Sequence, residues 1–133
     1  MKYMLDTNMI AYAVNCRPSQ VLENIHSHLQ DGLCISAVTM AELEYGICNS
    51  SRPEQNRLAL MLFLSPIEVL PFEALAAAYY GTIRADLKRR GEPIGANDML
   101  IAAHARSLGL TLVSNNLKEF EKVEGLATEN WTM

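Results

Sequence analysis

Short apolar runs alternate with helical patterns along this 133-residue chain. Apolar runs that end in polar turn formers are typical of buried strands. Residues 3–5, 33–36, 67–70 and 111–113 fit that description, and residues 126–128 predict a last edge strand. The pattern therefore predicts a sheet of four to five strands.

Helical patterns fill the segments between these strands. The expected helices begin near Asn8, at Pro18, at Thr39 and at Pro53, and two longer ones span Glu73–Arg90 and Asn97–Leu108. Strands that alternate with helices, and that are too apolar to leave one face in water, predict an α/β fold with a parallel sheet and helices on both faces. The chain shows no internal repeat or linker, so we expect residues 1–133 to form one domain.

Half of the residues are hydrophobic, which is enough to build a core without disulfides. Cys16, Cys34 and Cys48 show no C-x-x-C spacing, so we interpret them as reduced, partly buried thiols. The longest apolar run, Leu58–Leu64, is too short to span a membrane, and Asp6 interrupts any secretory signal. We therefore expect a cytoplasmic protein that does not enter a membrane.

The formal net charge of −4 argues against a protein that coats nucleic acid through a general basic field. An enzyme that holds one phosphodiester through metal ions remains compatible with it, because bound cations restore attraction locally. One basic cluster stands out at the end of the helix expected over Glu73–Arg90. Its Arg84 and Lys88 share a face and are candidate RNA contacts, although we slightly favour a solvated helix end whose cations complement the helix dipole.

Three carboxylates, Asp6, Glu42 and Asp98, stand where strands end or the following helices begin. Each has a structural explanation as well. Asp6 can cap the first helix, Glu42 can complete a capping box with Thr39, and Asp98 can complement the helix dipole behind a cap at Asn97.

These positions nevertheless fall at one edge of a parallel sheet, where α/β proteins bind ligands. Ser114, Asn115 and Asn116 close one strand much as Asp6, Thr7 and Asn8 close another, although a simple turn also explains them. Carboxylates that meet at one edge repel each other unless they bind a hard cation. Ligation by oxygen alone suits Mg²⁺ or Mn²⁺.

Four segments together resemble the motifs of the PIN domain. They are Met4–Asn8, Ala41–Gly46, Ile94–Asp98 and Ser114–Phe120. Within that family the chain most resembles the VapC toxins of type II toxin–antitoxin systems, and the resemblance runs in order over nearly the whole chain.

The resemblance implies that Asp6, Glu42, Asp98 and the position of Asn116 form the catalytic centre, with Asp6 and Asp98 as direct metal ligands and Glu42 as a further one. Many PIN domains carry a fourth acid where this chain has Asn116, so the number of metal ions stays open. Glu119, one helical turn further on, is an alternative acid.

The resemblance further implies supporting roles beside the metal site. Thr7 and Ser114 match hydroxyl positions, and Asn8 and Asn115 adjoin them. The implied activity is a Mg²⁺-dependent endoribonuclease, with Mn²⁺ as a possible substitute, that cleaves a structured RNA, expected to be tRNA, and thereby inhibits translation. No histidine stands where a general base would, and we interpret His26, His28 and His104 as structural or exposed.

A VapC-like protein also implies a VapB antitoxin, a homodimer and a toxin–antitoxin hetero-oligomer. The apolar helix pair over residues 40–64 offers a groove for the antitoxin, although Leu58, Met61 and Leu62 at helical spacing are more typical of a core. The residues suitable for stacking on RNA bases are few, and we expect Tyr79 and Tyr80 to pack in the core.

Three other functions compete with this interpretation. A phosphoryl-transfer hydrolase with Asp6 as nucleophile would need a second Asp where Asn8 stands, and a receiver domain would need an acid near Pro71. The third is a PIN fold that binds RNA without cleaving it, which Asn116 keeps open.

Overall fold

Five strands form one parallel sheet in the computed structural model, which describes residues 1–15 and 19–132. The strands are β1 (Tyr3–Leu5), β2 (Leu33–Ser36), β3 (Glu68–Leu70), β4 (Thr111–Val113) and β5 (Thr128–Glu129). Every pair of neighbours is parallel, in the order β3-β2-β1-β4-β5. The expectation of a parallel α/β sheet is confirmed.

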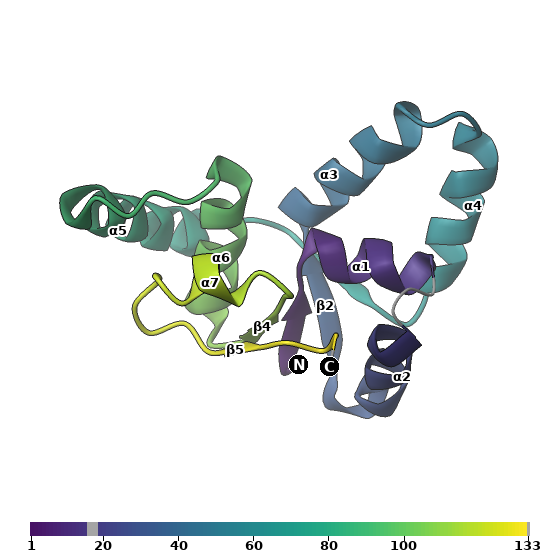
Figure 1. The fold of residues 1–133 in the computed structure, drawn as a ribbon, viewed down its shortest axis with the longest axis horizontal. Coiled ribbons are helices and arrows are strands. Elements are labelled where there is room, and N and C mark those ends of the chain that lie inside the picture. The colour runs from purple at the N-terminus through teal and green to yellow at the C-terminus, as the bar shows by residue number, and fades with distance from the viewer. Residues whose placement is uncertain (16–18, 133) are drawn as a thin grey trace.

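Helices cover both faces of this sheet (Figure 1). They are α1 (Thr7–Val14), α2 (Ser19–Ser27), α3 (Ala37–Cys48), α4 (Pro53–Leu64), α5 (Ala74–Arg90), α6 (Ala96–Leu108) and α7 (Leu117–Phe120), with a 3₁₀ turn at Leu29–Asp31. Helices α1 to α4 pack on one face, and α5 to α7 pack on the other.

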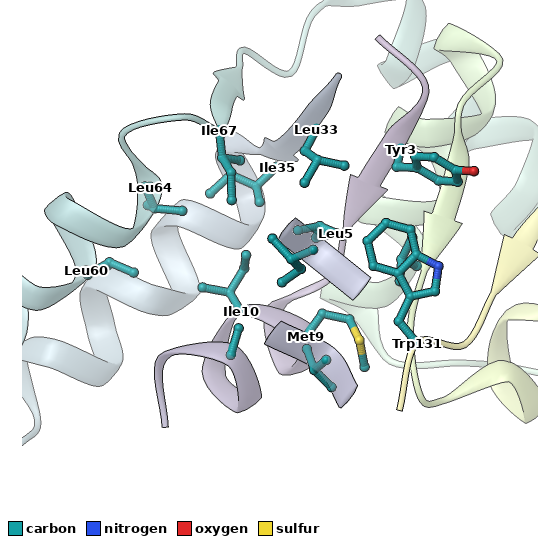
Figure 2. Packing of buried hydrophobic residues seen from close by; sticks show 14 of the residues in the cluster. Tyr3, Leu5, Met9, Ile10, Leu33, Ile35, Leu60, Leu64, Ile67 and Trp131 are labelled. Atoms are coloured by element: carbon teal, nitrogen blue, oxygen red, sulfur yellow. The ribbon is translucent and has the colours of Figure 1, made fainter. Parts of the chain in front are cut away.

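Alternate residues of each strand build the two cores. Tyr3 and Leu5 of β1 face the first helical layer, whereas Met4 between them faces the second. In β4, Val113 faces the first helical layer and Leu112 faces the second. Figure 2 shows the first core, in which side chains of β1 and β2 meet those of α1 and α4. The three central strands β1, β2 and β4 are buried on both faces, which explains why they are mostly apolar, whereas the edge strands β3 and β5 are partly exposed.

The central strands β1 and β4 define where a ligand can bind. The chain adds β2 and β3 on one side of β1, and later adds β4 and β5 on its other side. This reversal creates a topological switch point between the carboxyl ends of β1 and β4. Asp6 follows β1 and Ser114 follows β4, so both residues lie at that point.

Two expected helix starts are wrong. Helix α3 begins at Ala37 and is capped by Ser36, whose hydroxyl accepts a hydrogen bond from the backbone N–H of Val38, so Thr39 and Glu42 do not form a capping box. Helix α6 is preceded by Gly95 as its N-cap, so Asn97 lies inside the helix. Helix α2 begins at Ser19 in the described residues, and the expected start at Pro18 lies outside them.

The exposed face of α4 corrects a further expectation. Leu58, Met61 and Leu62 are 58%, 63% and 68% exposed, whereas Leu60 and Leu64 on the opposite face are buried. Leu58, Met61 and Leu62 therefore lie on the surface and not in the core.

The remaining expectations have mixed outcomes. Tyr79 and Tyr80 are half-buried against the second core, in keeping with the expected packing. Cys34 is a buried free thiol, Cys48 is exposed rather than partly buried, and Cys16 lies outside the described residues. Among the helices described, none has both the length and the apolar character that a bilayer crossing requires.

Candidate active site at the carboxyl edge of the sheet

Asp6 is buried at the end of β1, with 4% of its surface exposed. Its backbone N–H donates to the carbonyl of Val113, which ties it to β4. Its Oδ1 accepts a hydrogen bond from the backbone N–H of Met9 at 2.9 Å, so Asp6 caps α1. The capping role and a role in the site are therefore compatible, because one interaction uses only one of the two carboxylate oxygens.

Glu42 lies on α3 and faces both α1 and α6. Thr7, the first residue of α1, donates its hydroxyl to Oε1 of Glu42, and Asn97 of α6 donates to Oε2 at 3.2 Å. The buried hydroxyl of Thr39 lies 3.5 Å from that of Thr7. Glu42 thus joins three helices that begin or pass at the same edge of the sheet.

Asp98 lies in the first turn of α6 and is half-buried. Burial raises the pKa of its carboxyl, and the negative charges of Glu42 and Glu119 raise it further. Burial also raises the pKa of Asp6 to about 6, against the opposing effect of the Ser114 hydroxyl and the Met9 N–H. Asp98 and Glu42 add to the rise at Asp6. Asp6 and Asp98 therefore share one electrostatic environment in which ionisation is costly, and the charge of Glu42 contributes to it.

Ser114 is fully buried beside Asp6, and its hydroxyl accepts the backbone N–H of Asn116 at 2.8 Å. Asn116 is half-buried and precedes α7 as its N-cap. Asn115 is exposed and donates instead to the hydroxyl of Tyr12 at 2.8 Å. Asn8 is exposed on α1. Ser114 therefore adjoins Asp6 and Asn116 is bonded to Ser114, whereas Asn115 and Asn8 lie at the surface.

Glu119 of α7 is close enough to Asp98 to raise its pKa, and it also pairs with Lys122 at 3.7 Å. Arg84 and Lys88 lie exposed on α5, outside this constellation, and Arg84 donates to the hydroxyl of Tyr80 at 2.9 Å. In the described part of the chain, no three carboxylate, imidazole or thiol groups are gathered closely enough to hold a metal ion as they stand.

Two hollows adjoin Glu42. One, of about 430 Å³, is bordered by Thr7, Glu42, Asn97 and Tyr45. The other, of about 390 Å³, runs from Thr7 and Glu42 along the apolar walls of α1, α3 and α4. Glu42 is thus open to a ligand on one side and adjoins an apolar groove on the other.

Tyr45 is the site residue that the sequence reasoning missed. Its side chain is 71% exposed on the wall of the first hollow. It stands three residues after Glu42, and residues at that spacing share a face of a helix. This spacing was the available signal, and it places an aromatic ring beside the carboxylates.

Comparison with known proteins agrees with this architecture. The PIN domain model matches residues 3–126. Ribonuclease VapC2 of Haemophilus influenzae is 47% identical over 131 residues, covering 98% of both chains. The tRNA(fMet)-specific endonuclease VapC of Shigella flexneri is 46% identical over 132 residues, covering 99% of both chains.

A solved structure shows the same fold. The crystal structure of VapBC2 from Rickettsia felis, bound to a DNA fragment from its promoter, contains a chain that superposes with a TM-score of 0.93 at 42% identity, covering 98% of this chain and 99% of that one. The fold and these relatives define a nuclease of the PIN class. The chain belongs to the PIN-domain family and, within it, to the VapC ribonucleases.

Proposed function

We propose that this ribonuclease is a Mg²⁺-dependent endonuclease that cleaves tRNA, with Asp6, Glu42 and Asp98 as its catalytic carboxylates. The observation that carries the proposal is that the charges of Asp98 and Glu42 reach buried Asp6, and that of Glu42 reaches Asp98, at the topological switch point of the sheet. Structural ion pairing does not account for it, because no basic side chain among residues 1–15 and 19–132 contributes to the pKa of either aspartate.

The donor chemistry fits a hard divalent cation. Asp6 and Asp98 supply carboxylate oxygens, and Mg²⁺ and Mn²⁺ prefer such ligands. A cation between them would offset the burial and the charge repulsion that together raise both pKa values. Asp6 and Asp98 would hold the ion directly, and Glu42 would complete the set. When bound, such an ion neutralises charge on the scissile phosphate and lowers the pKa of its water.

The surrounding residues keep these carboxylates in place. Met9 and Ser114 stabilise the ionised form of Asp6, and Thr7 and Asn97 fix the orientation of Glu42. Asn116 carries no charge where many PIN domains have an acid, and Glu119 supplies a carboxylate near Asp98 instead. Thr7, Ser114 and Asn116 thus support the site, and Asn8 and Asn115 extend it at the surface.

Two features support an RNA substrate at this edge. Relatives from Shigella flexneri and Salmonella typhimurium are named tRNA(fMet)-specific endonucleases, at 46% and 41% identity. Exposed Tyr45 lies on the hollow beside Glu42, where a base of single-stranded RNA can stack on it. Arg84 and Lys88 on α5 are further candidate contacts with the phosphate backbone. Such a substrate would be met in the cytoplasm.

The direct test incubates the purified protein with initiator tRNA and, separately, with an elongator tRNA. We expect cleavage of the initiator tRNA in Mg²⁺ or Mn²⁺, none in excess EDTA, and products with 5′-phosphate ends. Cleavage that persists in EDTA would refute the metal-dependent mechanism. Equal cleavage of both tRNAs would refute the substrate assignment alone.

The apolar groove between α1, α3 and α4 supports binding of a VapB-type antitoxin. The groove is continuous with Thr7 and Glu42, so a peptide in it would also block the carboxylates. Solved relatives are toxin–antitoxin complexes bound to DNA. Ala59 is exposed on the groove wall, and we expect Ala59→Glu to weaken antitoxin binding without loss of cleavage. Gln55→Glu adds the same charge one turn earlier on α4, outside the groove, and is the matched control.

The exposed apolar face of α4 supports a second interface, in a homodimer. Leu58, Met61 and Leu62 form this face, and exposed apolar clusters of this kind mark interaction surfaces. We expect Leu62→Glu to convert a dimer to a monomer in sedimentation experiments. An unchanged dimer would place its interface elsewhere.

A further inference from the structure

His104 is a buried polar residue that the proposed chemistry does not use. It lies on α6, with 2% of its surface exposed. Its Nδ1 lies 2.8 Å from the hydroxyl oxygen of Ser36, across 68 residues of sequence. The ring also packs edge-on against Phe72, with 5.4 Å between the ring centroids.

The hydrogen-bond directions around this ring are determined by its partners. The imidazole also bonds the backbone of Pro71, and proline has no N–H, so that partner is a carbonyl that can only accept. The ring therefore donates one N–H to Pro71. Burial lowers the pKa of His104, so the ring is neutral and its other nitrogen, Nδ1, accepts the hydroxyl proton of Ser36.

Ser36 connects the His104 ring to the start of α3. Its hydroxyl oxygen accepts the backbone N–H of Val38 at 3.0 Å and thereby caps the helix. Ser36 is fully buried, so no bulk water can replace either partner. The hydroxyl donates its proton to His104 and accepts the N–H of Val38. These two hydrogen bonds together fix the start of α3 relative to α6.

Helices α3 and α6 carry Glu42 and Asp98, and they are joined at two places. Asn97 reaches Glu42 from the exposed first turn of α6. His104 reaches Ser36 from the same face of α6, about two turns further on. The exposed contact can exchange with water, whereas the buried contact cannot.

We propose that His104, through Ser36, is a positioning residue that holds Glu42 in register with Asp98. It does not touch the substrate. The inference rests on the proposed carboxylate site, because it concerns the spacing of two of its members.

The variants that test this role are His104→Leu, Ser36→Ala and the double variant. Partners that orient metal-binding residues contribute about tenfold or more to affinity or activity. We expect each single variant to lower kcat by about tenfold and to weaken Mn²⁺ binding, measured by calorimetry, by a similar factor, with KM for RNA unchanged. The double variant should be no worse than either single one, because the two residues act as a unit.

Two further variants separate positioning from stability. His104→Asn keeps an acceptor near the position of Nδ1, and we expect it to recover kcat to within about threefold of the wild type. Ser107→Ala is the matched control, because Ser107 lies one turn along α6 and, in the part of the chain that the structure describes, its hydroxyl bonds only the carbonyl of His104. It should leave kcat and Mn²⁺ binding unchanged.

Thermal unfolding of every variant accompanies these measurements. A lower Tm with wild-type kcat and Mn²⁺ affinity in the folded protein would show a purely structural role and overturn the inference. Asp98→Asn is measured in parallel. If it cleaves RNA at the wild-type rate, the proposed carboxylate site fails. If it is inactive while His104→Leu matches the wild type, only the positioning role fails.

Discussion

Asn97 of α6 donates a hydrogen bond at 3.2 Å to Glu42 of α3, across 55 residues of sequence. Thr7 donates to the other oxygen of the same carboxylate. Both oxygens of Glu42 thus have partners, whereas Asp98 accepts no side-chain hydrogen bond within residues 1–15 and 19–132. The two acids therefore differ in how free they are to hold a cation.

This difference predicts unequal effects of neutral substitutions. Gln at position 42 retains one acceptor for Thr7 or Asn97, and we expect Glu42→Gln to lower the cleavage rate by about tenfold to a hundredfold. Asp98→Asn removes the charge of a direct ligand and should reduce cleavage to background. Initial rates on one RNA at saturating Mg²⁺ measure both. Equal losses in the two variants would mean that Glu42, like Asp98, is a direct metal ligand.

The raised pKa of Asp6 predicts a pH-dependent stability in metal-free protein. Its pKa rises from 3.8 to about 6 on folding, so the folded state binds this proton more tightly than the unfolded state. The contribution of Asp6 is therefore most favourable below pH 4 and is lost as the pH rises to about 6. Asn also caps helices well, so Asp6→Asn should be more stable than the wild type at pH 7, by on the order of 1–3 kcal/mol.

Urea unfolding in EDTA at pH 4 and pH 7 checks this expectation. Asp31→Asn, at an exposed aspartate, is the control for a general charge effect. We expect the stability of the wild type relative to Asp6→Asn to fall from pH 4 to pH 7. If it does not fall, the assigned environment of Asp6 is wrong.

The exposed ring of Tyr45 predicts an effect on substrate binding. Stacking of one base on an aromatic side chain contributes about 1–3 kcal/mol, so Tyr45→Ala should raise KM by about tenfold or more. Tyr45→Phe keeps the ring and should resemble the wild type. Steady-state kinetics on a short single-stranded RNA separate KM from kcat. If KM is unchanged in Tyr45→Ala and antitoxin affinity falls, the ring belongs to the protein interface instead.

Asn116 predicts a gain of function. Its backbone N–H bonds Ser114, which adjoins Asp6, so an acid at this position adds charge to the same edge. We expect Asn116→Asp to tighten Mn²⁺ binding several-fold, because affinity for hard cations rises with ligand charge. Calorimetric titration with Mn²⁺ measures the change. Unaltered affinity would place Asn116 outside the metal environment.

The fold was largely predictable because its central strands are apolar on both faces and its long helices end at Gly91 and Gly109. Both glycines adopt the left-handed conformation that stops a helix. Helix starts were harder to predict where more than one residue can serve as the N-cap. Ser36 and Thr39 are both good caps, and only the extent of β2 decides between them.

The edge that gathers Asp6, Glu42 and Asp98 was also predictable, since a parallel sheet brings such positions together. The contacts within it were not. The bond from Thr7 to Glu42 depends on how α1 packs on α3, and that from His104 to Ser36 on how α6 meets β2. The exposure of Leu58 could not be predicted either, because α4 carries apolar residues on opposite faces.

The most direct test of the account is cleavage of initiator tRNA by the wild type, Asp6→Asn and Asp98→Asn, with circular dichroism to confirm that all three are folded. The account predicts Mg²⁺-dependent cleavage by the wild type and none by either folded variant. Wild-type cleavage by Asp6→Asn or Asp98→Asn would contradict the claim that these carboxylates form the active site.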